Sequence, residues 1–458
     1  MVLKKNKEIL LVILISLIIR LFFLILLNPW NNSVIQEKIL ISDAASYHRL
    51  AVDIYKNFSL SGFDAPYWTP GYPVFIALIY FAFGIKIWMV MLFQIVLNVC
   101  NSVLIYYLSK KVFDSQIISL VAALLFALCL PACYYTLRIL TETIFTFFFT
   151  LTVFLFFKNQ ESNKLGKYIQ IGILLGITTL IRPILIYFVY LLVLFVILQK
   201  SPLRIKIIKI SLLMFFFFLT ISPWQFYNFM KYNHYSISCQ MGLNYIDYSL
   251  PWMKSNLENI SLEYAHRDIK KVPLETIEKN NIQNPFEKEI IYLQEAKKYI
   301  FEHPLQYIKF HFIGSLNVFL SPFKSEIKGL LMIPYSDLPN QQWLGETIFE
   351  RVKRVIVNSY HEYFITIIAF LIQIFLLSSI IIGFLLKFDH ANVHYYLFVV
   401  LTMIYFAGLV GVIGDPRYGL PVIPLYLPLS AKGIYEMFLY IKRKIIRKKL
   451  NVFNQKLL

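Results

Sequence analysis

The chain has 458 residues, of which 58% are hydrophobic and only 15% are charged, and its formal net charge is +18. This composition excludes an ordinary soluble domain and predicts a protein that crosses a membrane several times. The positive charge does not indicate a nucleic-acid partner. The long polar segment 224–360 holds 15 basic residues against 14 acidic ones, so it presents no basic patch.

Ten apolar stretches approach the length of about 20 residues that a membrane-spanning helix needs. They are residues 8–28, 87–108, 116–134, 139–157, 167–182, 183–199, 207–223, 361–386, 393–413 and 418–440. The first is longer than the apolar part of a typical signal peptide and lacks a small-residue cleavage site, so we expect it to be retained. Arg20 lies inside this stretch and either extends towards the interface or contacts a lipid phosphate. Gly172 and Gly176, one turn apart in the fifth stretch, predict close helix packing.

Charge alternates from loop to loop along the chain. Twenty lysines and arginines, against four acidic residues, lie before the first stretch, after the last one and in every second loop between them. Basic loops stay on the cytoplasmic side, so both termini are predicted inside and residues 29–86 and 224–360 outside. The short apolar stretches 70–84 and 304–320 would reverse this sidedness if they crossed. We therefore expect them to lie at the outer surface or to re-enter it.

These elements predict an all-α polytopic membrane protein of about ten transmembrane helices, with juxtamembrane helices and a small loop region facing outwards. Residues 1–223 form an N-terminal membrane module whose first outer loop is 29–86. Residues 224–360 form a proline-rich outer region, which we interpret as a small cap and not as an independent domain. Residues 361–458 form the last helices and a basic cytoplasmic tail.

The first outer loop contains two candidate features. Asp43 and Tyr47 lie on one face of a predicted helix just beyond the first span. An aspartate at this point is a favoured helix cap, and a capping carboxylate can also face a cleft, so both interpretations stay open. The second feature is the rigid sequence Asp64-Ala65-Pro66-Tyr67-Trp68-Thr69-Pro70-Gly71-Tyr72-Pro73. Its rings are either membrane-interface anchors or a platform beside Asp43 on which a sugar or isoprenoid stacks.

Further charged and aromatic residues stand at the outer ends of later spans. They are Arg138, Glu142, Arg182, Arg417 and Tyr418. An acid in a first helical turn, as Glu142 is, commonly complements the helix dipole. Arginines at membrane depth usually have a partner. Arg182 and Arg417 therefore either pair with carboxylates or hold a phosphate, which suits the forked guanidinium group.

Several common functional motifs are missing from the sequence. It has no glycine-rich phosphate loop, no His-Glu-x-x-His zinc motif and no Gly-x-Ser-x-Gly elbow. Its four cysteines are placed neither as a disulfide framework nor as a zinc ligand set.

In combination and order, the motifs resemble the GT-C glycosyltransferases. The resemblance is to the branch that contains the protein O-mannosyltransferases and the aminoarabinose transferases of lipid A (glycosyltransferase family 39). The residues that carry it are Asp43 with Tyr47, Pro70-Gly71-Tyr72-Pro73-Val74-Phe75, Thr141-Glu142, Arg182-Pro183, Pro223-Trp224 with Asn228, and Arg417-Tyr418 with Pro421 and Pro424. The resemblance covers the membrane core and leaves out most of 235–300 and 325–358.

This resemblance implies a bundle of GT-C type and transfer of a sugar from a polyprenyl phosphate at the outer face. Asp43 would be the catalytic general base on the acceptor hydroxyl, with inversion at the anomeric carbon. Arg182 and Arg417 would offset the charge of the departing phosphate. The remaining predicted substrate-binding residues are Tyr47, Tyr67, Tyr72, Arg138, Glu142 and Tyr418.

The sequence departs from the family pattern in two respects. Thr69 stands where many relatives have a basic residue, which removes one donor-phosphate contact. Some relatives with other donors use a divalent metal, but the first loop has no comparable acidic pair. We therefore expect catalysis without a metal or another cofactor.

The predicted protein is an inner (plasma) membrane glycosyltransferase, either a hexosyl- or a pentosyltransferase, with its active site on the periplasmic or extracellular side. Its partners would be a polyprenyl-phosphate-linked sugar donor, membrane lipids and an outward-facing protein, lipid or polysaccharide acceptor. One alternative is a lipid-linked-sugar flippase or transporter without bond chemistry. Transporters usually place polar residues near the midplane, often in two related halves, and neither feature is evident here. The other alternative is an O-antigen ligase or polymerase.

Overall fold

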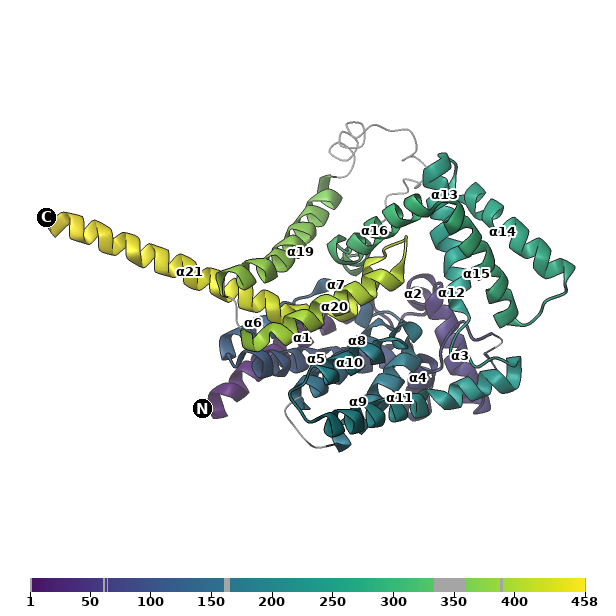
Figure 1. Cartoon of the computed structure of the whole chain (residues 1–458), viewed down its shortest axis with the longest axis horizontal. Coiled ribbons are helices and arrows are strands. Elements are labelled where there is room, and N and C mark those ends of the chain that lie inside the picture. Colours follow the sequence, from purple (N-terminus) through teal and green to yellow (C-terminus); the bar gives the residue numbers. More distant parts are fainter. Residues whose placement is uncertain are drawn as a thin grey trace.

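The computed structural model describes residues 2–60, 62–63, 65–159, 165–332, 360–387 and 390–457. Within these ranges the regular structure is helical throughout, which confirms the predicted all-α fold class (Figure 1). The apolar stretches form α1 (Val2–Leu27), α4 (Gly71–Phe83), α5 (Ile87–Phe113), α6 (Gln116–Ala127), α7 (Leu130–Thr136), α8 (Glu142–Asn159), α9 (Gly166–Ile181), α10 (Phe188–Ile197), α11 (Leu203–Tyr232), α19 (Tyr360–Leu386), α20 (Val393–Val410) and α21 (Ile423–Leu457). The remaining segments form α2 (Asn32–Val34), α3 (Asp43–Asn57), α12 (Gln240–Asn244), α13 (Leu250–Glu258), α14 (Leu262–Lys279), α15 (Pro285–Glu302), α16 (Pro304–Leu320) and α17 (Lys324–Leu330), with short 3-10 or π turns between some of them.

Six of these helices are long and apolar enough to cross a membrane. They are Lys7–Leu27, Ile87–Phe113, Glu142–Asn159, Leu203–Tyr232, Phe364–Leu386 and Val393–Val410. The pair α6 and α7 adds a seventh if it is one span bent by 53°. Gly166–Ile181 and Pro183–Ile197 are apolar but shorter. The chain is therefore a multi-pass membrane protein, and the number of ten spans stays a prediction.

The stretches 70–84 and 304–320, which the pattern of basic loops predicts not to cross the membrane, form the short helices α4 and α16. The 13 residues of α4 extend about 20 Å at 1.5 Å per residue, less than the ~30 Å of a hydrocarbon core. The 17 residues of α16 pack beside the end of α20, where a Cβ on Gly314 would lie 2.5 Å from the carbonyl oxygen of Gly411. The interfacial placement of both helices stays a prediction.

The predicted close packing at the two glycines is confirmed. Both face α11 from α9. A Cβ on Gly172 would lie 2.6 Å from the carbonyl oxygen of Leu213, and one on Gly176 would lie 2.6 Å from Cβ of Thr220. Only a residue without a side chain lets the two backbones approach this closely. The partner helix also runs farther than predicted, because α11 continues through Pro223 to Tyr232.

Neither interpretation of Arg20 is correct. The side chain is fully buried inside the bundle. It donates to Oδ1 of Asn98 on α5 at 2.9 and 2.6 Å, and to the carbonyl oxygen of Ala127 at 2.9 Å. Ala127 is the last residue of α6, where helix carbonyls lack partners within the helix. The guanidinium therefore stabilises the break between α6 and α7 and does not reach lipid.

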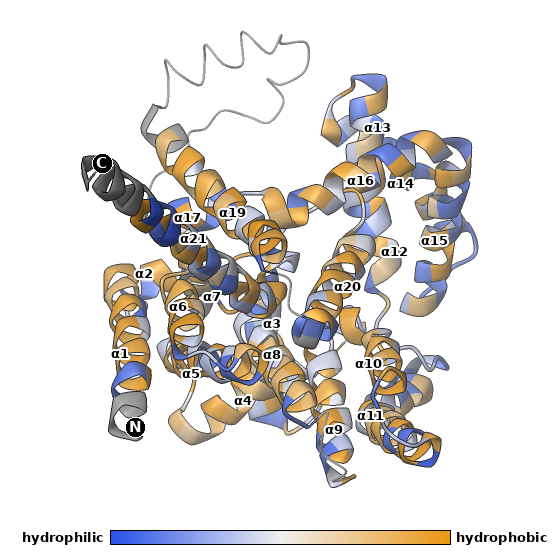
Figure 2. Ribbon diagram, turned by 60° about the vertical axis from the view of Figure 1, so that its left-hand side comes forward, coloured by the Kyte–Doolittle hydropathy of each residue, from blue (hydrophilic) through white to orange (hydrophobic). Residues whose placement is uncertain are grey.

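The polar segment between α11 and α19 has a small core of its own. Its buried members are Ile246, Leu250, Met253, Ile269, Ala296 and Tyr299, and Val412 joins them from beyond α20. Figure 2 shows hydrophilic residues concentrated on α14 and α15, whereas α1, α6 and α20 are predominantly hydrophobic. Because part of this core comes from the C-terminal third of the chain, the segment packs onto the bundle as a cap.

Candidate functional site

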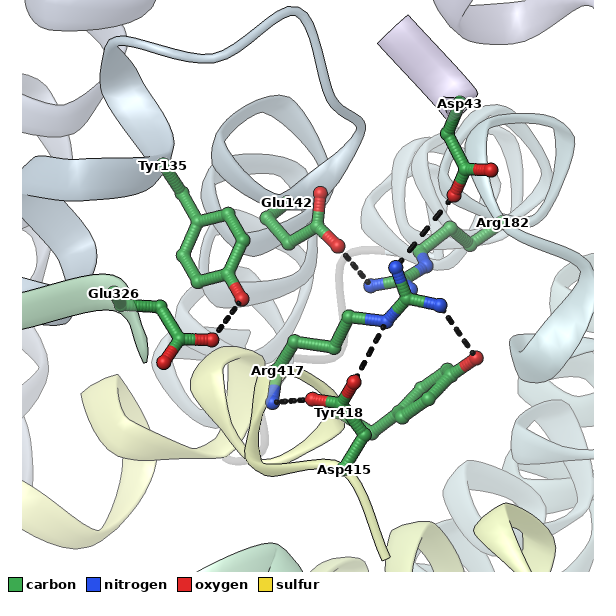
Figure 3. Close-up of polar contacts among 8 residues, drawn as sticks. All are labelled: Asp43, Tyr135, Glu142, Arg182, Glu326, Asp415, Arg417 and Tyr418. Carbon is green, nitrogen blue, oxygen red and sulfur yellow. Dashed lines mark hydrogen bonds and ion pairs between the residues drawn. The ribbon is translucent and has the colours of Figure 1, made fainter. Parts of the chain in front are cut away.

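Asp43 is the first residue of α3, and its carboxylate contacts the guanidinium of an arginine. Ser42 occupies the cap position before the helix, so Asp43 is its first helical residue and not its cap. The structure thus rejects the cap interpretation. Oδ2 of Asp43 instead lies 3.6 Å from Nη1 of Arg417 (Figure 3). This contact joins the first loop to the start of the last predicted span.

Arg417 sits in a short 3-10 turn, Pro416–Tyr418, that Asp415 caps. The Arg417 backbone N–H donates to Oδ1 of Asp415 at 2.9 Å, and its Nε lies 3.6 Å from Oδ2 of the same carboxylate. Burial lowers the pKa of Arg417, but Tyr418, Glu142 and Asp415 outweigh it and raise the pKa well above its ordinary value. The guanidinium therefore stays charged. Sequence reasoning missed Asp415, for which the Asp-Pro turn was the only signal.

A second ion pair lies beside the first. Nη1 of Arg182 is 3.4 Å from Oε1 of Glu142, whose side chain is 2% exposed. The Arg182 guanidinium also lies 4.9 Å from the ring centre of Tyr418, and Arg417 lies 5.1 Å from that same ring. Both guanidinium groups therefore lie close to the Tyr418 ring (Figure 3). The structure brings together the two arginines and the carboxylates that the sequence placed far apart.

The aromatic platform beside Asp43 is present in part. The Tyr47 ring packs against Trp68 with centres 4.9 Å apart, and against Tyr72 at 5.0 Å. Burial raises the pKa of Tyr47, so its hydroxyl stays protonated. Tyr67 and Trp68 line the same cavity as Asp43.

Two predicted substrate-binding residues are not brought into this cavity. Tyr72 is buried behind Tyr47 and donates to Oε1 of Gln94 at 2.8 Å. Arg138 instead donates to the carbonyl oxygen of Lys38 and stacks over the ring of Tyr134 at 4.7 Å. Both side chains have structural partners: Tyr72, on α4, contacts α5, and Arg138, in the turn between α7 and α8, contacts the first loop. Asp64 lies outside the described residues.

The site is a cavity of about 520 Å³ between the bundle and the cap. This volume is within the range of small-molecule sites. Its lining includes Asp43, Tyr47, Tyr67, Glu142, Arg182, Arg417 and Tyr418, together with cap residues such as His234, Tyr245 and Glu289. Sequence reasoning missed the cap residues, because no pattern in the sequence links them to a first-loop aspartate.

Another buried carboxylate lies beside this cavity. Oε1 of Glu326, on α17, accepts a hydrogen bond from the Tyr135 hydroxyl at 2.8 Å (Figure 3). Its other oxygen is buried without a partner among the described residues. Burial raises the pKa of the Glu326 carboxyl. Nothing in the sequence pattern singled out this residue.

Within the described part of the chain, no group of three or more His, Cys, Asp or Glu residues is placed to hold a metal ion. Its four cysteines are unpaired. Metal independence stays a prediction.

Residues 64–227 match the family described as dolichyl-phosphate-mannose-protein mannosyltransferase, which confirms the resemblance inferred from the motifs. The matched segment includes Tyr67, Glu142 and Arg182, whereas Asp43 and Arg417 lie outside it. No curated protein matches the chain.

Among solved structures, the chain is similar to the oligosaccharyltransferase AglB from Archaeoglobus fulgidus in complex with an inhibitory peptide and a dolichol-phosphate. The identity is 13% and the TM-score 0.46, over 98% of this chain and 52% of that one. A second similarity is to ArnT from Cupriavidus metallidurans bound to undecaprenyl phosphate, with 10% identity and a TM-score of 0.36, over 92% of this chain and 77% of that one. The chain spans about half the length of the archaeal oligosaccharyltransferase.

Proposed function

We propose, from the family match of residues 64–227, that the chain is an integral membrane glycosyltransferase which moves a sugar from a polyprenyl phosphate to an outward-facing acceptor. The observation that carries the proposal is the convergence of the Asp43 carboxylate and two arginines, Arg182 and Arg417, on one cavity. These are the charges that such a transfer needs, because it removes a proton from a hydroxyl and leaves negative charge on a phosphate.

In the proposed reaction the acceptor hydroxyl oxygen attacks the anomeric carbon as Asp43 takes the hydroxyl proton. The bond between the anomeric carbon and the phosphate oxygen breaks, and its electron pair stays on the departing polyprenyl phosphate. Arg417 and Arg182 stabilise this anion. A single displacement from the side opposite the phosphate inverts the configuration at the anomeric carbon.

The contact of Arg417 with Asp43 is loose at 3.6 Å, and both side chains are about a third exposed. Such pairs contribute little to stability. A phosphate that binds Arg417 would therefore compete with Asp43 at little cost and free the carboxylate for the acceptor hydroxyl. Donor binding and activation of the base are thus coupled in this proposal.

The proposed location is the plasma membrane, with the cavity on the side opposite the basic loops. The sidedness test introduces a cysteine at exposed Lys56 of α3 into a variant in which Cys100, the one exposed native cysteine, is replaced. A membrane-impermeant thiol reagent is expected to label it from outside intact cells. Labelling only after lysis would contradict the proposed orientation.

The function is tested with purified protein in lipid nanodiscs and a polyprenyl-phosphate sugar. Wild-type protein is expected to release polyprenyl phosphate and to lengthen an acceptor, while Asp43→Asn loses about 10²–10⁴-fold in rate. Transfer by the Asn variant at the wild-type rate would exclude Asp43 as the base. Recovery of unaltered donor on the far side of sealed vesicles would instead favour the flippase.

A further inference from the structure

The cavity has a second polar part that the proposed displacement does not use. We call it the cap subsite, because α12, α15 and the chain around them in the cap contribute most of it. Its polar lining consists of Tyr67, His234, Ser236, Ser238, Gln240, Asn244, Tyr245 and Glu289. Among the described residues that line the cavity, the lysines and arginines are Arg182 and Arg417, both in the ion-pair cluster. The cap subsite thus contains a carboxylate and no cation of the Lys or Arg type.

Glu289 is held so that one of its oxygens stays available. Oε1 accepts hydrogen bonds from the backbone N–H groups of Met241 at 3.1 Å and Gly242 at 3.4 Å. The glycine at position 242 allows the two segments to approach this closely, because a Cβ on Gly242 would clash with the carbonyl oxygen of Glu289 at 2.9 Å. Within the described residues Oε2 makes no hydrogen bond or ion pair, and the side chain lines the cavity. Burial raises the pKa of the Glu289 carboxyl, and the two N–H groups oppose that rise.

The wall around Glu289 is rich in rings. His234 stacks on Phe286 with ring centres 4.6 Å apart and planes 10° from parallel. The Tyr67 backbone is fixed because its carbonyl oxygen accepts from the Ser238 hydroxyl at 3.2 Å. Ring faces, amide and hydroxyl groups and one carboxylate acceptor suit a ligand that carries several O–H donors on an apolar ring, as a sugar does.

We propose that the cap subsite binds the acceptor and selects it by charge: it takes a neutral or amine-bearing glycosyl group and rejects an anionic one, with Glu289 as the selecting side chain. A hydroxyl or ammonium group donates a charge-assisted hydrogen bond to a carboxylate. A phosphate or carboxylate ligand would instead place like charges together in a partly desolvated space. This inference deepens the proposed function, because it presumes that a glycosyl acceptor enters this cavity.

The first experiment measures binding without donor, so that it does not depend on transfer. Three probes differ in charge on one ring: phenyl glucoside, phenyl glucosaminide and phenyl glucuronide. Titration calorimetry on wild-type protein in nanodiscs is expected to show the glucosaminide binding at least as tightly as the glucoside. The glucuronide should bind about tenfold more weakly, as expected for one charged hydrogen bond. Glu289→Gln, which keeps shape and acceptor capacity, should remove most of that difference.

The matched control is Glu287→Gln, the same substitution at an exposed position two residues earlier on α15. It should keep the wild-type preference. An equal charge preference in wild type and Glu289→Gln, or no binding of any probe to wild type, would overturn the inference. Donor turnover, followed as release of polyprenyl phosphate, is measured separately. Its absence in wild type would contradict the proposed function, and binding with the expected charge preference would still support the cap subsite.

Discussion

Arg417 lies 3.6 Å from Asp43 and bridges the first loop and the start of the last predicted span. The proposed base and the arginine proposed to bind the donor phosphate therefore contact each other directly. The contact between them is longer than a good hydrogen bond, and each side chain is about one third exposed. In the proposed function, this contact couples donor binding to release of the base.

The first prediction concerns the shape of the Arg417 guanidinium. Arg417→Gln removes the charge and is expected to lower kcat/KM for a polyprenyl-phosphate sugar by about 10²–10³-fold, as for other transition-state charge contacts. Arg417→Lys keeps the charge but loses the fork, so it should restore only part of the rate. Lys56→Gln, at an exposed position of α3, is the charge control. Wild-type kinetics in both Arg417 variants would exclude a role in phosphate binding.

The second prediction concerns the pair of Arg182 and Glu142. Arg182→Met leaves the buried Glu142 carboxylate without its cation, which should destabilise the protein by about 3–5 kcal/mol. Adding Glu142→Gln to that variant should recover most of the loss, because no buried charge then remains. Thermal unfolding in detergent checks both values. Additive losses in the double variant would show that the two side chains do not interact.

The third prediction concerns pH and Glu326. The folded-state pKa of this carboxyl is raised by burial above its ordinary value of 4.5. Its stabilising contribution is therefore complete below that value and is lost as pH rises through the folded pKa. Glu326→Gln should unfold at a higher temperature than wild type at pH 8, with the gap closing towards pH 4. A gap that does not change with pH would rule out this carboxylate as its cause.

The fourth prediction concerns packing of α9 on α11. Gly172→Ala forces a Cβ against the Leu213 carbonyl oxygen and should cost about 1–3 kcal/mol. Gly408→Ala is the matched control, because a Cβ on Gly408 of α20 meets nothing within 4 Å. Unfolding temperatures compare the two variants. Equal unfolding temperatures would show that α9 and α11 accommodate the added Cβ without loss of stability.

Much of the fold could be predicted, because a bilayer permits few backbone structures. Apolar stretches near the bilayer length predict helices, and alternating basic loops predict their orientation. The close packing at the glycine pair in α9 could also be predicted, because two glycines one turn apart indicate close approach of two helices. The bend between α6 and α7 was not predicted, although Pro131 in the first turn of α7 is a local signal for a helix break; that Arg20 donates across the bundle to the Ala127 carbonyl at this break needed the structure.

The candidate site was predicted as a set of residues and not as an arrangement. Four of its residues could be recognised from the sequence, because charged side chains at the outer ends of apolar helices usually have a partner or a function. They are Asp43, Glu142, Arg182 and Arg417. Which carboxylate meets which arginine was not predicted, nor was the packing of Tyr72 on Gln94 and of Arg138 on the first loop, outside the cavity.

By itself, therefore, the sequence determined the all-helical membrane fold and the candidate charged residues, since both follow from local composition and spacing. Only the tertiary structure decided that Arg417 meets Asp43, that Arg182 meets Glu142, and that Glu289 of the cap lines the same cavity. Those contacts join residues that are between 40 and 374 positions apart in the chain. They are set by how the helices pack, which no local pattern of residues records.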